Sequence, residues 1–459
     1  MLGKRVPFWV SFKTYKFRRK QRTYISNEKT HDFFVFDGIA SKLWDLISKG
    51  ATDFELRLWA SKNGIKDDFD DFLAMLQDLD LIENSSPHKK EVIIEQANST
   101  TYDEKEAINF LAKKSNNLIK NNYLGELVFE LTYKCNLLCE HCYNDKDINS
   151  VEEISFEEAK TIIDEASSLG VSSIILTGGE CTVAKDFLKI ARYIREKRIS
   201  LEIFTNGQLL YDNEKLFTEI VSLYPYRVSL SLYSTNPDIH EKITKVKGSH
   251  AKTISVIKKL KEQNILVGIK CFLTSVNANS YSEVSKFATE NGCSMTLDCN
   301  FIDNPTRQNQ HMKVTEEQLF DIYTNRDSSL RIKSVLYKNS TNFKTSSICS
   351  VGKKMLTITP SLEVVCCPSF KKKVGDLKVE SLSEIWNSQD KNSELNKIKK
   401  LIRSSLKECY TKDYCKYCLY CVGSSFYAGK YLKKYEEFCR TAKIRMEAAK
   451  LNRKIDRSK

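Results

Sequence analysis

The sequence contains little proline and glycine and no long apolar run. Its 459 residues include only 7 Pro and 16 Gly, which argues against a collagen-like chain and against a largely disordered one. No stretch of about 18 apolar residues occurs, so we expect no membrane-spanning helix. The N-terminal MLGKRVPFWV lacks an apolar segment followed by a small-residue cleavage site, so a secretory signal is not expected either. These absences predict a cytoplasmic protein with no membrane partner.

Cysteine, by contrast, is abundant, with 15 in the chain. The cytosol is too reducing for a disulfide framework, and fifteen thiols are too many for ordinary core filling. Ligation of a metal or of iron–sulfur clusters is therefore the leading explanation for the cysteine content.

The formal net charge of +13 is concentrated at the two ends of the chain. Residues 1–30 hold nine Lys or Arg and one acidic residue, which gives a net charge of +8. Residues 422–459 hold eleven Lys or Arg and four acidic residues, which gives +7. Aromatic residues do not interleave with these charges as they do in RNA-binding modules, so a nucleic acid is not the expected partner. Acidic peptides and acidic electron carriers suit such basic ends better.

The N-terminal region predicts a small domain of mixed structure. Arg22–Ser26 and Phe33–Phe36 are rich in aromatic and β-branched residues, and Asn27–Thr30 separates them, so they predict a β-hairpin. Three helices with apolar residues at helical spacing follow, the first ending at Gly50 and the second near Gly64. A hairpin packed on three helices is a winged-helix unit.

Over roughly residues 8–85 this pattern resembles the RiPP recognition element, a domain that holds the leader of a ribosomally made precursor peptide. The resemblance implies that a leader adds as a strand to the hairpin edge and lies against the third helix. A DNA-binding winged helix or a purely structural domain is the alternative. We assign this domain to residues 1–85 and a polar linker to 86–122.

From Glu126 onward, short apolar strands alternate with helical segments. Such alternation predicts parallel strands joined by helical crossovers. Six repeats in about 180 residues suit an incomplete (β/α)6 TIM-like barrel, whose chemistry lies at the C-terminal ends of the strands. The strands are predicted at residues 127–131, 171–176, 201–204, 228–232, 266–272 and 295–297.

Three thiols follow the first of these strands in CxxxCxxC spacing, namely Cys135, Cys139 and Cys142. Three thiolates on one loop can hold three irons of a 4Fe–4S cube and leave the fourth iron open. A structural zinc site completed by His141 is the alternative. The spacing resembles the signature of the radical S-adenosylmethionine (SAM) superfamily over roughly residues 124–335. The resemblance implies that SAM binds the open iron and yields a 5′-deoxyadenosyl radical, which makes these three residues catalytic.

The same resemblance implies a set of SAM contacts at the ends of successive strands. Gly178, Gly179 and Glu180 look like the family motif whose backbone and carboxylate receive the amino group of SAM. We expect Lys270 to be an ordinary charged residue at the barrel mouth. For Ser229 and Ser231, an outward-facing or turn-capping hydroxyl is the alternative. The remaining expected contacts are Tyr143, Thr205, Asn206, Ser229 and Ser231.

The C-terminal region resembles the SPASM extension of peptide-modifying radical SAM enzymes, which usually holds two auxiliary 4Fe–4S clusters. Leu362 departs from that pattern, because it stands where the usual glycine falls before Cys367. The late cysteines also run in an unusual order of spacings, and a zinc ribbon at Cys415 and Cys418 is the alternative. The expected auxiliary ligands are Cys349, Cys367, Cys409, Cys415, Cys418, Cys421 and Cys439, with Cys366 as the spare. Inert packing is expected for Cys181, Cys271, Cys293 and Cys299.

Three domains are therefore predicted in addition to the linker: residues 1–85 for recognition, 123–335 for the barrel and 336–459 for the auxiliary clusters. The resemblances together imply an α/β radical SAM oxidoreductase that binds a precursor leader and installs a thioether (sactipeptide-like), C–C or C–O cross-link in the core peptide. A flavodoxin or ferredoxin-type protein is the expected electron donor. The alternatives are a radical SAM epimerase or other peptidyl oxidase and, outside enzymes, an iron–sulfur scaffold or RNA-binding sensor.

Overall fold

The computed structural model comprises two compact units, residues 1–121 and 122–459. Within the part of the chain that the structure describes, no helix is both long and apolar enough to cross a bilayer. The structure describes residues 9–10, 14–19, 22–27, 33–36, 38–48, 51, 53–65, 69–78, 81–83, 124–144, 151–197, 199–223, 225–263, 265–302, 309–325, 347–406, 408–409 and 411–457.

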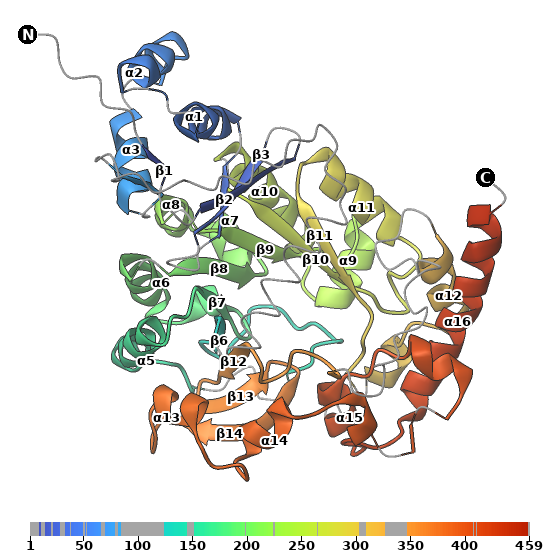
Figure 1. Cartoon of the computed structure of the whole chain (residues 1–459). Helices are drawn as coiled ribbons and strands as arrows, with labels where there is room; N and C mark the ends of the chain where they lie inside the picture. Colours follow the sequence, from blue (N-terminus) through green and yellow to red (C-terminus); the bar gives the residue numbers. More distant parts are fainter. Residues whose placement is uncertain are drawn as a thin grey trace, which may run out of the picture. The chain divides into compact units, whose positions relative to one another are not determined.

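The first unit combines two small antiparallel sheets with three helices (Figure 1). The predicted hairpin is present, because β3 pairs antiparallel with β4, but the prediction missed the outer strand β2, which pairs with β3 along its whole length. The three predicted helices are also present. The predicted linker at 86–122 lies outside the described residues. The elements are β1 (Trp9–Val10), β2 (Thr14–Arg19), β3 (Arg22–Asn27), β4 (Phe33–Phe36), α1 (Gly38–Ser48), α2 (Asp53–Lys62), α3 (Phe69–Asp78) and β5 (Ile82–Glu83).

The helices of this unit meet around a small apolar core. Trp44 and Leu56 are almost fully buried, and Phe36 contacts the rings of Trp44 and Phe72 edge-on. Arg57 of α2 binds the carboxylates of Asp53 and Asp70, which connects α2 to α3 on the surface. The apolar spacing read from the sequence places most of the predicted faces of α1 and α3 inward, but Ile39 of α1 is exposed.

The second unit is built on a nine-stranded sheet with the order β11-β10-β9-β8-β7-β6-β12-β13-β14. All pairs from β6 to β11 are parallel, so the predicted α/β class with a parallel sheet is confirmed. The six strands are β6 (Glu126–Glu130), β7 (Ser173–Thr177), β8 (Ser200–Thr205), β9 (Arg227–Ser231), β10 (Val267–Phe272) and β11 (Ser294–Asp298).

Helices cover the outer side of this curved sheet (Figure 1). Their apolar faces explain the cover: Ile190 and Ile194 of α6 and Ile257 of α10 are fully buried in the core formed with the strands. Ser155 and Glu158 form a capping box at the start of α5. The helices are α5 (Phe156–Ser168), α6 (Phe187–Glu196), α7 (Gln208–Asp212), α8 (Glu214–Ser222), α9 (Pro237–Thr244), α10 (Ser249–Glu262), α11 (Tyr281–Glu290) and α12 (Glu316–Thr324), with 3-10 turns η1 (Cys181–Val183) and η2 (Asn309–Met312).

The C-terminal region continues the same sheet instead of starting a new one. β12 pairs parallel with β6, and β13 and β14 then add as an antiparallel hairpin. The long helix α16 packs against α12 and against η4. The elements are β12 (Met355–Ile358), β13 (Glu363–Cys367), β14 (Phe370–Asp376), α13 (Leu382–Asn387), α14 (Glu394–Lys399), η3 (Arg403–Ser405), η4 (Asp413–Tyr417), α15 (Val422–Tyr427) and α16 (Glu436–Arg457).

Candidate functional site

A cavity of about 460 Å³ lies at the C-terminal ends of the parallel strands. Parallel strands direct their carboxyl ends to one edge, which is where chemistry is expected in such folds. The structure brings to this one cavity every residue that the sequence assigned to the radical cluster and to SAM: Cys135, Cys139, Cys142, Tyr143, Gly178, Gly179, Glu180, Thr205, Asn206, Ser229 and Ser231.

The cysteine loop after β6 is held in place by backbone hydrogen bonds on two sides. Leu138 N donates to Thr244 O at 3.0 Å, and Glu140 N donates to Ile243 O at 3.2 Å, so the end of α9 holds the middle of the loop. On the other side, Glu180 N donates to Lys134 O at 2.8 Å. These backbone contacts position the three thiols without help from a bound cofactor.

The three cysteines of this loop are half-buried. Burial raises the pKa of the Cys135 thiol to about 12 and raises that of Cys139 further. Within the described residues, no three metal-ligating side chains converge on a single ion. An iron–sulfur cube has a different requirement, because each of its thiolates binds a separate iron.

Gly178 and Gly179 allow the strand-end loop after β7 to lie directly against the cysteine loop. A Cβ atom on Gly178 would lie 2.3 Å from Thr132 O, and Gly178 has a φ of +136°. A Cβ on Gly179 would lie 2.4 Å from the carbonyl oxygens of both Tyr133 and Lys134. Only glycine permits this approach, so the pair joins the two loops that border the cavity.

The carboxylate of Glu180 is fully buried and joins the ends of two strands. Its Oε1 accepts hydrogen bonds from Thr182 N, Thr182 Oγ1 and Thr205 Oγ1, and its Oε2 accepts one from Asn206 N at 2.6 Å. Burial raises the pKa of Glu180, and these hydrogen bonds oppose the rise. Most of the carboxylate's capacity is thus used internally, and Oε2 retains room for a further donor.

Asn206 connects the third strand end to the cysteine loop. Its Nδ2 donates to Asn136 Oδ1 at 2.6 Å and lies 3.9 Å from the sulfur of Cys135. The residue stands directly after Thr205, whose hydroxyl binds Glu180. One short chain of contacts therefore runs from the β7 end through the β8 end to the first thiol.

Ser229 and Ser231 lie two residues apart on β9, so both face the cavity. The hydroxyl of Ser229 donates to Glu202 Oε1 at 2.9 Å, and Arg227 binds the same carboxylate. Lys270 of β10 also lines the cavity, with Nζ 3.5 Å from the centroid of the Phe204 ring, and burial lowers its pKa. The cavity floor is thus polar and internally paired.

Sequence reasoning missed a buried ion pair beside the cavity. Glu130, at the end of β6, binds Lys371 of β14, and both side chains are largely buried. The phenols of Tyr133 and Tyr143 donate to the two oxygens of Glu130 at 3.4 and 3.3 Å. Lys371 lies 241 positions from Glu130, so no local pattern in the sequence could have revealed the pair.

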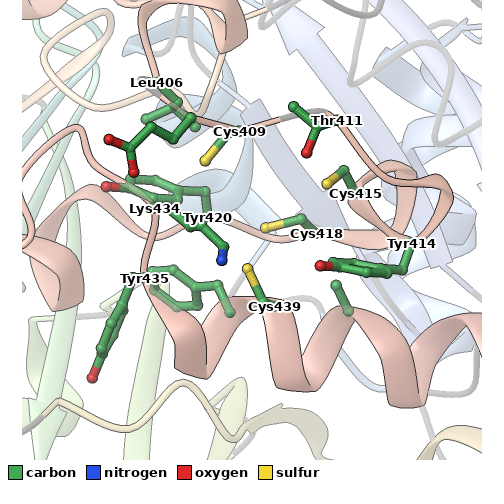
Figure 2. A pocket seen from close by; sticks show the side chains of 13 residues that line it. Leu406, Cys409, Thr411, Tyr414, Cys415, Cys418, Tyr420, Lys434, Tyr435 and Cys439 are labelled. Carbon is green, nitrogen blue, oxygen red and sulfur yellow. The ribbon is translucent and has the colours of Figure 1, made fainter.

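The C-terminal cysteines separate into groups. Four of them line one small cavity, and Figure 2 shows their sulfurs turned toward one another, with Cys439 rising from α16 beneath the other three. Burial raises the pKa of the Cys418 thiol to about 12, with further contributions from neighbouring thiols of this group. We call these residues the four-thiol group: Cys409, Cys415, Cys418 and Cys439.

A second group consists of Cys349, Cys367 and Cys421. Burial raises the pKa of the Cys367 thiol to about 12, and Cys421 and Cys349 raise it further. We call them the three-thiol group. Cys366, the predicted spare, is fully buried, and a Cβ on Gly352 would lie 3.2 Å from its sulfur.

The four remaining cysteines make weak contacts typical of packed thiols. Cys181 lies 3.3 Å from Phe204 O, Cys271 3.7 Å from Tyr233 O and Cys293 3.6 Å from Asn291 O. Cys299 lies 3.6 Å from the Tyr323 hydroxyl. None of these contacts joins them to the two thiol groups.

Leu362 adopts the backbone conformation that glycine usually supplies at its position. Its φ is +67°, in the left-handed region. A non-glycine residue there carries a cost of roughly 1 kcal/mol or more, and the Leu362 side chain is buried in the core. The turn before β13 is therefore kept even though the expected glycine is absent.

Family models match two parts of the chain. Residues 129–288 match the radical SAM superfamily, and residues 349–421 match the SPASM model, described as an iron–sulfur cluster-binding domain. The first range contains the cysteine loop and the strand ends around the cavity. The second contains the three-thiol group and three members of the four-thiol group.

Curated relatives include two peptide biosynthesis proteins of Bacillus subtilis. The antilisterial bacteriocin subtilosin biosynthesis protein AlbA is 28% identical over 331 residues, which cover 69% of this chain and 70% of AlbA. The sporulation killing factor maturation protein SkfB is 30% identical over 156 residues, which cover 34% of this chain and 37% of SkfB.

Solved structures of the same fold include Streptococcus suis SuiB bound to S-adenosylmethionine. That alignment covers 94% of this chain and 99% of SuiB, with a TM-score of 0.55 and 16% identity. The protein anSMEcpe with bound AdoMet and a Cp18Cys peptide covers 71% of this chain and 97% of its own, with a TM-score of 0.53 and 17% identity. At these identities the likeness is one of fold.

Proposed function

This chain is a radical SAM protein with a SPASM iron–sulfur domain, and from that premise we propose that it is a maturase that cross-links a ribosomally made precursor peptide. The observation that carries the proposal is the single cavity shared by the three loop thiols and all eight expected SAM contacts. The runner-up activities are peptide epimerisation and another peptidyl oxidation.

The described residues fit the implied cofactors. Cys135, Cys139 and Cys142 would hold a cluster with one open iron, and the polar strand ends beside them would receive SAM. When bound, these groups supply a radical that can remove hydrogen from an unactivated carbon. The protein's own contribution is to orient the bound molecule through Asn206, Glu180 and the serines.

The C-terminal thiol groups would hold the auxiliary clusters. Four thiols around one cavity suit complete ligation of a 4Fe–4S cluster, and the three-thiol group suits a second. Forming a cross-link is a net two-electron oxidation of the peptide, so an electron acceptor near the substrate is needed. An acidic flavodoxin or ferredoxin-type protein would suit the basic ends of the chain as the external donor.

We assign leader binding to the N-terminal unit. In the part of this unit that the structure describes, β2 and β4 are the edge strands of the sheet β2-β3-β4, and an edge strand can accept an added peptide strand. Holding the leader there would raise the local concentration of the core peptide to about the millimolar range for a short flexible tether. Support comes from AlbA, named for subtilosin biosynthesis, and from SuiB, whose structure includes one bound to its precursor peptide SuiA.

The test is anaerobic reaction of the reconstituted full-length chain with SAM, a reductant and precursors encoded beside its gene. We expect SAM cleavage and a peptide that has lost two hydrogens. SAM cleavage with no change in peptide mass would favour epimerisation. A peptide that gains oxygen would favour another oxidation. No cleavage of SAM under any reducing condition would reject the enzyme and favour an iron–sulfur scaffold.

Deleting residues 1–85 tests the recognition role separately. We expect SAM cleavage to continue and modification of a leader-bearing peptide to fall at least about tenfold, because the millimolar local concentration is lost. A leaderless core peptide is the matched control, since its turnover should not change. Equal turnover of the leader-bearing peptide by both proteins would remove leader binding from the proposal.

A further inference from the structure

Two carboxylates line the large cavity, and they differ in how much of their hydrogen-bonding capacity is used. Glu180 accepts four hydrogen bonds from Thr182, Thr205 and Asn206, and it is fully buried. Asp298 is the other carboxylate. Its side chain is open to the cavity, whose walls still remove part of its solvation. Of the two, Asp298 is therefore the one that can exchange a proton with a bound molecule.

Asp298 is the last residue of β11, at the level of the cysteine loop. In the parallel register it pairs with Phe272 of β10, and the Phe272 ring stacks on His141 of that loop with centroids 5.2 Å apart. Asn300 orients the carboxylate, since its N and Nδ2 each donate to Oδ1 at 2.9 Å. Among the described residues no side chain donates to Oδ2. The backbone N–H of Cys299 also donates to the carboxylate, and Oδ2 keeps room for a ligand.

The surroundings of Asp298 suit a proton acceptor. Burial raises its pKa, while hydrogen bonds from Asn300 and Cys299 and the positive charge of Arg445 on α16 oppose that rise. A carboxylate with a raised pKa is a stronger base than a free one. Two further titratable groups lie nearby. Lys270 is on the neighbouring strand β10, and the phenol of Tyr323 on α12 contacts Cys299, the residue after Asp298.

Other ionisable groups around the cavity are less suited to the task. The phenols of Tyr133 and Tyr143 donate to Glu130. Burial lowers the pKa of Lys270, but its ammonium lies over the Phe204 ring and the charge of Glu202 opposes that fall. The ring of His141 is enclosed by Phe272 and Tyr233.

We propose that Asp298 is the catalytic base, whose Oδ2 accepts the proton released by a peptide N–H, O–H or S–H group when that atom bonds to a peptide carbon. This inference rests on the proposed cross-linking function. Closing such a bond removes two hydrogens from the peptide. One leaves as a hydrogen atom in the SAM-dependent step. The other leaves as a proton, which goes to Asp298, and an electron, which goes to an oxidised iron–sulfur cluster.

The test compares Asp298→Asn, Asp298→Glu and the parent chain, each reconstituted with iron and sulfide. The measured quantity is cross-linked peptide formed per SAM cleaved. Asp298→Asn should lower this ratio about 100-fold or more, the usual contribution of a general base, and Asp298→Glu should restore part of it. Asp212→Asn is the matched control, because Asp212 pairs with Lys252 on the outer surface and should leave the ratio unchanged.

The pH profile separates a base from a structural residue. In Asp298→Asn, the cross-linking rate should rise about tenfold per pH unit over the range in which the peptide group must ionise unaided, whereas the parent profile should be flatter. The assignment would be overturned if Asp298→Asn formed as much cross-linked peptide per SAM cleaved as the parent chain. It would also be overturned if this ratio fell but the pH profile stayed the same as that of the parent chain. A parent chain that cleaves SAM but forms no cross-link would instead reject the proposed function and not this residue in particular.

Discussion

The cysteine loop and the C-terminal thiol groups bring thiols together in two very different ways. The loop presents three thiols within eight residues, 135–142, so their convergence follows from one short segment after one strand. The four-thiol group combines a loop at 409–418 with Cys439 on α16, and the three-thiol group spans residues 349–421. A compact spacing can thus be recognised in sequence, whereas a dispersed ligand set exists only once the fold is formed.

Replacing Cys135, Cys139 and Cys142 together by Ala should have the largest effect. SAM cleavage should be abolished, because no open iron would remain, while iron bound by the C-terminal groups should stay at about eight per chain if both auxiliary clusters assemble. The measurements are deoxyadenosine formation and iron content. Loss of all iron would show that the two regions do not bind iron independently.

Cys418→Ala should be the next most severe change, with Cys366→Ala as its matched control. Cys418 belongs to the four-thiol group, so its loss should remove about one cluster and reduce peptide modification while SAM cleavage continues. Cys366 is buried outside that group, so its variant should retain the full iron content. Equal iron loss in both variants would contradict the grouping.

Lys371→Met tests the ion pair that joins the two regions. It leaves the buried Glu130 carboxylate without its cation, which should cost about 3–5 kcal/mol in the free energy of unfolding. The double variant Glu130→Gln with Lys371→Met should recover much of that loss. Denaturant unfolding of the four proteins in the cycle measures the coupling, and additive effects would show that the pair contributes nothing.

Gly179→Ala should have the smallest effect on stability, about 2–3 kcal/mol, because the added Cβ would overlap two carbonyl oxygens. Affinity for SAM should fall as well, since the strand-end loop must move away from the cysteine loop. Gly170→Ala is the control: its Cβ meets nothing within 4 Å, so only the strain of its φ of +77° remains. Isothermal titration with SAM distinguishes them, and equal affinities would reject the close approach as a requirement.

Much of the fold and of the radical site could be predicted because both depend on local patterns. The alternation of apolar strands and helices predicted all six parallel strands to within a few residues. The CxxxCxxC and Gly-Gly-Glu segments each lie directly after a strand, and parallel strands end at one edge, so their meeting follows from topology.

The remaining features depend on contacts between distant parts of the chain. Strand β2 lacked a recognisable turn signal, and the pairing of Glu130 with Lys371 depends on β14 reaching the barrel. The division of the C-terminal cysteines into groups depends on where α16 packs. The conformation of Leu362 was also hidden, because its side chain favours a different backbone from the one the turn requires.

The pairing of β12 with β6 has a consequence for any attempt to separate the barrel from the cluster-binding region. A barrel truncated before residue 355 would leave β6, an almost wholly buried strand, as an edge strand with unpaired backbone N–H and C=O groups. Such an edge recruits strands from other molecules, so the fragment would tend to aggregate. The barrel strands and the cluster-binding region therefore depend on each other to fold.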